Sequence, residues 1–210
     1  MYRLFIKRVL DIAISIAVLP IFVILYIVFG ILIKLEDKGP VFYKAERIGK
    51  DKKIFLMYKF RSMKVNAPLL VNSDGSTYNS KDDPKVTKVG KFMRETSIDE
   101  IPQILNVLKG DMSIIGPRAS LASVLHSFKD DEIDKMKVKP GITGYTQAYY
   151  RNGLPNRERR LKDAWYANNL SFWLDLKILI KTFVTIFKKN GIYTNNESYN
   201  EIKDDLKNLQ

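Results

Sequence analysis

The feature that most limits how this chain can fold is a run of 22 residues without a charge, from Ile12 to Ile33. As an α-helix the run is about 33 Å long, enough to cross the hydrocarbon core of a bilayer. Helices in soluble cores are rarely this long without a polar face, and the apolar part of a signal peptide is shorter, roughly 7–15 residues. No small-x-small cleavage pattern follows Ile33. The run predicts a membrane anchor, residues 1–33, that stays on the protein.

Pro20 lies near the middle of this run and predicts a bend, because proline removes one backbone hydrogen bond and clashes with the preceding turn. Both flanks are basic: Arg3, Lys7 and Arg8 precede the run, and residues 34–64 carry ten basic against four acidic side chains. Basic flanks prefer the cytoplasmic side of a membrane. A re-entrant helix, which enters and leaves on one face, keeps both flanks on that side. A straight span is the alternative.

Behind the anchor, the sequence predicts a small α/β domain that is mostly helical, residues 34–190, and a polar tail, residues 191–210. Two β-rich runs, 41–48 and 54–60, flank a turn-like segment and predict a hairpin. The remaining patterns predict helices at 96–108, 120–137, 156–169 and 171–189, a short strand within 111–117, and loops at 64–85 and around Gly144.

The segment 172–189 has an aromatic start, a strongly apolar middle and a basic end. This pattern is typical of an amphipathic helix that lies on a membrane surface. It is equally typical of a core helix of the domain, and the sequence leaves both interpretations open.

Composition narrows the chemistry. The chain has 35 lysine and arginine residues against 23 acidic ones, a formal net charge of +12, which favours phosphates, anionic lipid or nucleic acid as partners. It has no cysteine and one histidine, His126. Disulfides, thiol nucleophiles, Cys/His zinc sites and two-histidine metal sites are therefore excluded.

Asp99 and Glu100 form the most informative carboxylate pair. Thr96 and Ser97 each precede a carboxylate by three residues, so the segment predicts a helix start with hydroxyl caps, where an aspartate stays ionised. Capping alone is the simpler interpretation. The density of cations nearby in sequence, Lys59, Arg61, Arg94 and Arg118, instead favours a site for Mg²⁺ and a phosphate chain.

Ordered motifs cover almost the whole chain. They are Lys7-Arg8 with Asp11, Lys59-Phe60-Arg61-Ser62-Met63, Arg94 with Ser97-Ile98-Asp99-Glu100-Ile101-Pro102-Gln103, the stretch Asn106 to Arg118, Lys139-Pro140-Gly141-Ile142-Thr143-Gly144, and Tyr166 with Asn169, Ser171, Asp175 and Lys177. Together they resemble the bacterial sugar transferase family, whose members are monotopic polyprenyl-phosphate phosphoglycosyl transferases. Three positions depart from the family pattern: Leu19 replaces a serine, Ala119 a proline, and Tyr145-Thr146 a Trp-Ala pair.

The resemblance implies a two-step transfer of sugar-1-phosphate from a UDP-sugar to polyprenyl phosphate, with release of UMP. The residue matching Asp99 would be the nucleophile, with Glu100 as its catalytic partner, and Mg²⁺, or Mn²⁺, would bind this pair. The substrate-binding positions implied by the resemblance are Lys59, Arg61, Arg94, Pro117, Arg118, Gln147 and Arg151.

The resemblance also implies a location and partners. We expect the domain on the cytoplasmic face of the bacterial inner membrane, in contact with lipid, with no nucleic-acid partner; a homo-oligomer and downstream glycosyltransferases are further partners to test. One rival function is a membrane-anchored nucleic-acid-binding protein, favoured by the net charge and by the stretches 149–151 and 157–160. Another is an inactive scaffold of a glycan-assembly complex. Release of UMP from a UDP-sugar separates the three.

Overall fold

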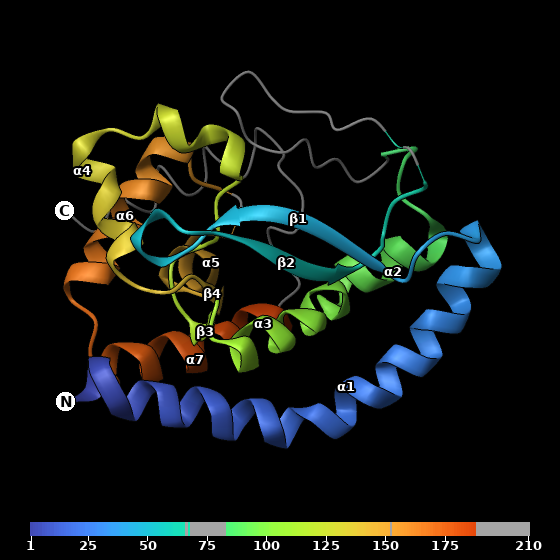
Figure 1. Cartoon of the computed structure of the whole chain (residues 1–210), viewed down its shortest axis with the longest axis horizontal. Coiled ribbons are helices and arrows are strands. Elements are labelled where there is room, and N and C mark those ends of the chain that lie inside the picture. The colour runs from blue at the N-terminus through green and yellow to red at the C-terminus, as the bar shows by residue number, and fades with distance from the viewer. Residues whose placement is uncertain (66, 68–82, 152, 188–210) are drawn as a thin grey trace.

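The computed structural model describes residues 1–65, 67, 83–151 and 153–187. Helices make up most of these residues, joined by two small two-stranded sheets (Figure 1). The mostly helical domain with a hairpin is therefore confirmed. The predicted tail 191–210 and most of the predicted loop 64–85 lie outside the described residues.

The apolar run forms one long helix. A π-helical turn, η1 (Tyr2–Ile6), leads into α1 (Lys7–Asp37), and Lys38 ends the helix in the left-handed conformation with φ of 50°. Figure 1 shows α1 bending along the edge of the molecule, as expected for a helix with Pro20 inside it. Only 22% of its apolar window is buried, so most of its apolar surface faces away from the protein. Among the described residues, η1 and α1 together are the one helix long and apolar enough to cross a membrane.

Both ends of α1 are bonded to the rest of the protein. Near its start, Arg8 donates to the carbonyls of Val107 and Leu108 at 2.6 and 3.0 Å. Near its end, Glu36 accepts hydrogen bonds from the backbone N–H groups of Lys88 and Val89 at 2.7 and 3.0 Å. The bent helix is therefore bonded to the folded domain near both of its ends.

The predicted hairpin is confirmed. Strands β1 (Phe42–Ile48) and β2 (Ile54–Phe60) are antiparallel, and the turn η2 (Lys50–Lys52) joins them. Phe60, which is buried, packs with Phe22 and Phe29 of α1 and with Met93 and Ile104 in one apolar cluster. The hairpin is thus held against the second half of α1.

The centre of the chain differs from the prediction. The helix α2 (Lys88–Glu95) was not predicted, and the expected helix at 96–108 is a 3₁₀ helix, η3 (Ile98–Gln103), followed by α3 (Ile104–Lys109). Pro102 lies inside η3 and has no N–H to donate, so a regular α-helix is disfavoured there.

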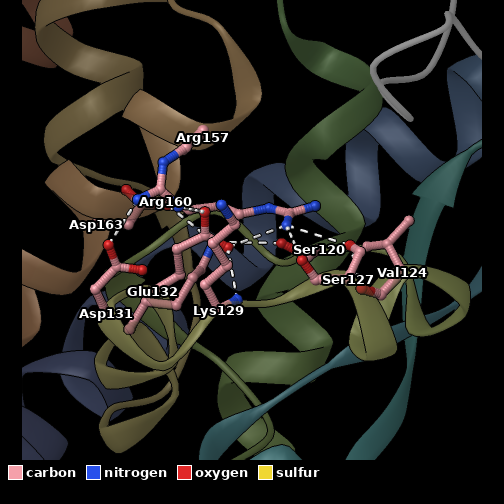
Figure 2. A network of polar contacts seen from close by, with 10 residues as sticks. Ser120, Val124, Ser127, Lys129, Asp131, Glu132, Arg157, Arg160 and Asp163 are labelled. Carbon is pink, nitrogen blue, oxygen red and sulfur yellow. Dashed lines mark hydrogen bonds and ion pairs between the residues drawn. The ribbon is translucent and has the colours of Figure 1, made fainter.

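The last third of the described chain packs around a parallel pair of short strands. Strand β3 (Ser113–Ile115), predicted from the sequence, pairs with β4 (Gly141–Thr143). The predicted helix at 120–137 is instead broken into the short turns η4 (Ala122–Ser127), α4 (Asp130–Ile133) and η5 (Asp134–Lys137). Hydrogen bonds and ion pairs from α6 hold these turns (Figure 2). Side-chain contacts with α6, which comes later in the chain, replace the regular hydrogen bonds of a longer helix.

Three helices follow. The segment after Gly144, expected to be a loop, contains α5 (Tyr145–Tyr150), while α6 (Asn156–Asn168) and α7 (Phe172–Phe187) agree with the predicted helices. In α7, Ile178 is fully buried while Trp173 and Phe183 are exposed. This helix therefore combines both interpretations of its sequence: one face belongs to the core and the other is apolar and uncovered.

Candidate active site

Asp99 and Glu100 lie in the first turn of η3, but the predicted hydroxyl caps are wrong. The Ser97 side chain makes no capping hydrogen bond, and its backbone is left-handed with φ of 59°. The Thr96 hydroxyl donates backwards to the carbonyl of Phe92 at 2.8 Å, at the end of α2. Thr96 therefore caps the end of α2 rather than the start of η3. This weakens the interpretation that the two carboxylates only complete a capping box.

Lys59 joins the two carboxylates. It lies on β2, which packs against η3, and its Nζ is 2.5 Å from Glu100 Oε1 and 3.8 Å from Asp99 Oδ2. The strand places the lysine 41 residues before Glu100 in sequence but directly against it in space. The predicted grouping of Lys59 with the acidic pair is confirmed.

The two carboxyl groups have opposite pKa shifts. Burial, together with the negative charge of Glu100, raises the pKa of Asp99, and the charges of Lys59, Arg94 and Arg118 only partly offset this. For Glu100, burial acts in the same direction, but the nearby cations outweigh it and lower its pKa. The expectation that a helix start alone keeps Asp99 ionised is therefore corrected: burial opposes ionisation, and the surrounding cations favour it.

Arg94 and Arg118 reach the site from two other elements. Arg94, on α2, donates through Nε to the Ser62 hydroxyl at 2.9 Å, and its charge acts on Asp99. Arg118 follows β3, is exposed, and its charge lowers the pKa of both carboxyl groups. The structure thus brings Lys59, Arg94 and Arg118 together around the acidic pair, as predicted.

Arg47 is a site residue that the sequence reasoning missed. It lies on β1, and its charge acts on Glu100, while its own pKa is lowered to about 10 by burial and by the charge of Arg118. Its Nε is buried without a hydrogen-bond partner among the described residues. A signal was present, since Arg47 is one of two cations, with Lys44, on the strand that pairs with the strand carrying Lys59.

Arg61 lies elsewhere. Its side chain is buried and its Nη2 is 3.3 Å from Asp37, at the end of α1. Gly39 lies so close that a Cβ there would be 1.6 Å from the Arg61 guanidinium, so any larger residue would displace that side chain. The contacts of Arg61 join α1 to the hairpin and do not include the acidic pair.

Gln147 and Arg151 are also not brought to the acidic pair by the contacts they make. Gln147 donates to the Ile142 carbonyl at 3.0 Å, and its own carbonyl oxygen is buried without a partner in the described part of the chain. Arg151 donates to the Thr185 carbonyl of α7. Their expected role in substrate binding remains a prediction.

Pro117 directly precedes Arg118, whose charge acts on the acidic pair. It is buried, its carbonyl accepts a hydrogen bond from Gly141 N–H at 3.0 Å, and with Arg118 it lines a shallow pocket. Ile48 and Met136 form part of the apolar wall of this pocket. Pro117 and the exposed Arg118 thus share one small pocket with apolar residues.

A comparison with known families decides which kind of protein carries this site. The sequence model of one family, described as bacterial sugar transferase, matches residues 2–189. This chain belongs to the bacterial sugar transferase family. The match includes the anchor, the acidic pair and every cation described above, so the resemblance seen in the motifs is confirmed.

Curated proteins similar to this chain have transferase names. An undecaprenyl-phosphate galactose phosphotransferase of Salmonella typhimurium is 39% identical over 202 residues, which cover 90% of this chain and 42% of that protein. A UDP-N-acetylgalactosamine-undecaprenyl-phosphate N-acetylgalactosaminephosphotransferase of Aeromonas hydrophila is 41% identical, over 89% of this chain and 45% of that protein. The uncharacterized sugar transferase EpsL of Bacillus subtilis is 37% identical, over 90% of this chain and 91% of that protein.

The chain therefore spans less than half the length of the first two relatives and nearly all of the third.

Proposed function

We propose that this chain is a phosphoglycosyl transferase that moves sugar-1-phosphate from a UDP-sugar to undecaprenyl phosphate and releases UMP. One observation carries the proposal: a buried carboxylate, Asp99, lies among three cations beside a long apolar helix whose outer surface is uncovered. A soluble diphosphate donor needs the cations, and a lipid acceptor needs the apolar surface. The names of the relatives from Salmonella and Aeromonas support this pairing of donor and acceptor.

The chemistry proceeds in two displacements. An ionised oxygen of Asp99 attacks the phosphorus that carries the sugar, forming an O–P bond while the bond to UMP breaks. A phosphate oxygen of the lipid then attacks the same phosphorus, breaking the bond to Asp99 and leaving a polyprenyl diphosphate sugar. Lys59, Arg94 and Arg118 offset the charge of the phosphate oxygens in both displacements.

Mg²⁺ is part of the proposal. Asp99 and Glu100 offer hard carboxylate oxygens, and no group of three or more acidic or histidine side chains that could hold an ion occurs among the described residues. Two carboxylates fit Mg²⁺, which commonly takes its remaining ligands from water and from substrate phosphate. When bound, the ion would neutralise phosphate charge, and Lys59 would remain the cation that holds the carboxylates together.

The contacts of α1 support the re-entrant arrangement. Asp11 accepts hydrogen bonds from Ser113 and Ile114 at 3.0 and 2.9 Å, and Asp37 at the far end pairs with Arg61. A straight span would put these two ends on opposite faces of a hydrocarbon core about 30 Å thick, so one set of bonds would break. We therefore infer that both ends, and the domain, lie on the cytoplasmic face of the bacterial inner membrane.

Labelling tests this topology cleanly because the chain has no cysteine. Single cysteines at Tyr2 and Lys38 should be protected from a membrane-impermeant maleimide in intact cells and labelled in inverted vesicles. Labelling of either position from outside the cell would establish a straight span.

The decisive experiment for the function measures UMP. Purified protein in detergent receives Mg²⁺, undecaprenyl phosphate and, one at a time, UDP-galactose, UDP-N-acetylgalactosamine or UDP-glucose. At least one donor should yield UMP in a reaction that requires the lipid for turnover. Absence of UMP with a broader panel of UDP-sugars would reject the enzyme and leave the scaffold, and salt-sensitive binding of duplex DNA in its place would favour the nucleic-acid rival.

A further inference from the structure

A second lysine and carboxylate pair lies behind the site. Asp163, on α6, is fully buried, and its carboxylate accepts hydrogen bonds from Arg118 N–H at 3.2 Å, from Lys135 Nζ at 3.0 Å and from the Thr146 hydroxyl at 2.9 Å. Lys135 Nζ also donates to the Arg118 carbonyl at 3.0 Å and to the Ser120 hydroxyl at 3.3 Å. The N–H and the C=O of Arg118 are therefore both bound by one buried ion pair.

Lys135 has no hydrogen left for a ligand. An ammonium group has three donors, and the three acceptors named above use all of them. Although Lys135 lines the pocket beside Arg118, its bonding is complete within the protein. Its effect on a substrate must therefore pass through the residues it holds.

The segment on either side of Arg118 is held by different neighbours. The Pro117 carbonyl accepts from Gly141 N–H, and the Ser120 carbonyl accepts from Ile48 N–H at 2.9 Å. Because the Pro117 carbonyl and the Arg118 N–H belong to one peptide group, Gly141 and Asp163 hold that group at its two ends, while Lys135 holds the next group through the Arg118 carbonyl. The side chain of Arg118 starts from this frame and acts on the acidic pair.

We propose that Lys135 and Asp163 are positioning residues that hold the Arg118 main chain so that its guanidinium meets the phosphates of the UDP-sugar. This inference rests on the proposed function, because it needs Arg118 to bind the donor. It assigns a role to two residues that never touch the substrate.

The same region provides a matched control. Glu132 is buried like Asp163 and also ties the segment between β3 and β4 to α6, through Arg157 at 3.0 Å and Arg160 at 3.2 Å (Figure 2). Its carboxylate accepts a third hydrogen bond, from Lys129 N–H. These three partners of Glu132 all lie outside the segment 116–120. A change at Glu132 therefore disturbs the packing on α6 without loosening the Arg118 peptide groups.

The test is a double-substitution cycle on the full chain. It compares wild type, Arg118→Ala, Lys135→Met, the combination of the two, and Glu132→Gln, using the UDP-sugar of the panel above that gives the fastest UMP release. We expect Arg118→Ala and Lys135→Met each to raise KM for that donor about tenfold or more. The combination should be no worse than Arg118→Ala alone, because Lys135 acts through Arg118. Glu132→Gln should lower Tm without changing KM.

Each other outcome has one meaning. A combination whose two effects multiply, or a normal KM in folded Lys135→Met, overturns the positioning role and leaves the function intact. A normal KM in Arg118→Ala removes Arg118 from donor binding and the inference with it. A rise in KM for Glu132→Gln equal to that of Lys135→Met would show a general packing effect and reject the inference.

A second variant covers failure to fold. Lys135→Met leaves Asp163 as an unpaired buried charge, whereas Lys135→Met combined with Asp163→Asn removes both charges, and neutral replacements of buried pairs are often tolerated. In that variant the bond from Lys135 to the Arg118 carbonyl is still absent. The same rise in KM is expected, and a wild-type KM in this folded variant would overturn the proposal.

Discussion

Two pairs of lysine and carboxylate differ in how far solvent reaches them. Lys59 meets Glu100 and Asp99 at a site where the lysine side chain is 19% exposed and that of Glu100 is 23% exposed. Lys135 meets Asp163 where the side chains are 7% and 0% exposed, and every donor of the ammonium is used. The comparison teaches that a lysine and carboxylate pair can take part in a reaction where a ligand reaches it, whereas a pair that no ligand reaches can only hold neighbouring groups in place.

Burial acts on both pairs, but with different results. At the site, burial raises the pKa of Asp99, so its negative charge depends on its cations. Behind the site, burial lowers the pKa of Lys135, and the charge of Asp163 acts in the opposite direction. Removing a member of the first pair should therefore change catalysis, and removing a member of the second should change stability and substrate position.

The largest effect is expected at Asp99. Asp99→Asn should lower turnover by at least about a thousandfold in protein that still folds, because an amide is a far poorer nucleophile than a carboxylate. UMP release measures the loss, and an unchanged Tm shows that the fold survives. If the pair only stabilised its helix, turnover would change little and stability would fall by about 1 kcal/mol.

Labelling identifies the attacking residue. With donor labelled in the sugar and no lipid present, wild type should release at most one equivalent of UMP and keep the label on the peptide that contains Asp99. Asp99→Asn should keep none. Label on Glu100 would reverse the assignment, and no UMP burst at high enzyme concentration would indicate direct transfer to lipid phosphate.

The next largest effect on turnover is expected when the metal ion is removed. In EDTA we expect turnover to fall below about a hundredth of its initial rate and to return with Mg²⁺ or Mn²⁺, because two carboxylates and a diphosphate require a hard cation. The buried Lys135 and Asp163 pair should be indifferent to EDTA, so Tm should change little. Full turnover in chelator would show that lysine and arginine suffice.

The pH profile separates the two lysines. The charge of Lys59 lowers the pKa of both Asp99 and Glu100, so Lys59→Met should raise them. At a fixed pH less Asp99 is then ionised, and the acidic limb of kcat/KM should move to higher pH while the maximum falls by about a hundredfold or less. Lys135→Met should move the limb less, because Lys135 acts on the two carboxyl groups only through Arg118. An unmoved limb in Lys59→Met would mean that ionisation of Asp99 does not limit the rate.

For stability, the pair that matters less for turnover should matter more. Lys135→Met should lower the free energy of unfolding by about 3–5 kcal/mol, because it leaves a buried charge without its partner. Lys59→Met should cost no more than about 1 kcal/mol, because solvent reaches that pair. Denaturant unfolding of both variants in the same detergent measures the difference. Equal losses would contradict the division of roles between the pairs.

The sequence predicted the elements whose signals are local. The hairpin, α6 and α7 follow from alternation, turn residues and helical spacing, and the anchor from the absence of charge over 22 residues. The prediction failed where contacts distant in sequence decide: α5 forms after Gly144 beside α7, and residues 120–137 break into short turns against α6. Thr96 was predicted to cap the helix of the acidic pair but instead bonds to the end of α2.

The candidate site shows the same division. Lys59, Arg94 and Arg118 were predicted from their motifs and do lie around Asp99. Arg61 is two residues from Lys59 and directly follows β2, yet its side chain pairs with Asp37 at the end of α1. Arg47 was missed because it lies outside the motifs that carry the family resemblance, and the tertiary structure brings its charge to Glu100 and Arg118.

By itself, the sequence determined that the chain contains a long uncharged helix, that thiol and two-histidine chemistry is excluded, and that the motifs belong to one family. Only the tertiary structure decided which cations face the acidic pair, that both ends of α1 return to one domain, and that Lys135 and Asp163 bind the Arg118 main chain. The physical reason is the separation along the sequence over which each interaction acts. Hydrophobicity and turn chemistry act between neighbours in sequence, whereas charge, burial and hydrogen bonding act between whatever groups the packed chain brings within a few ångströms.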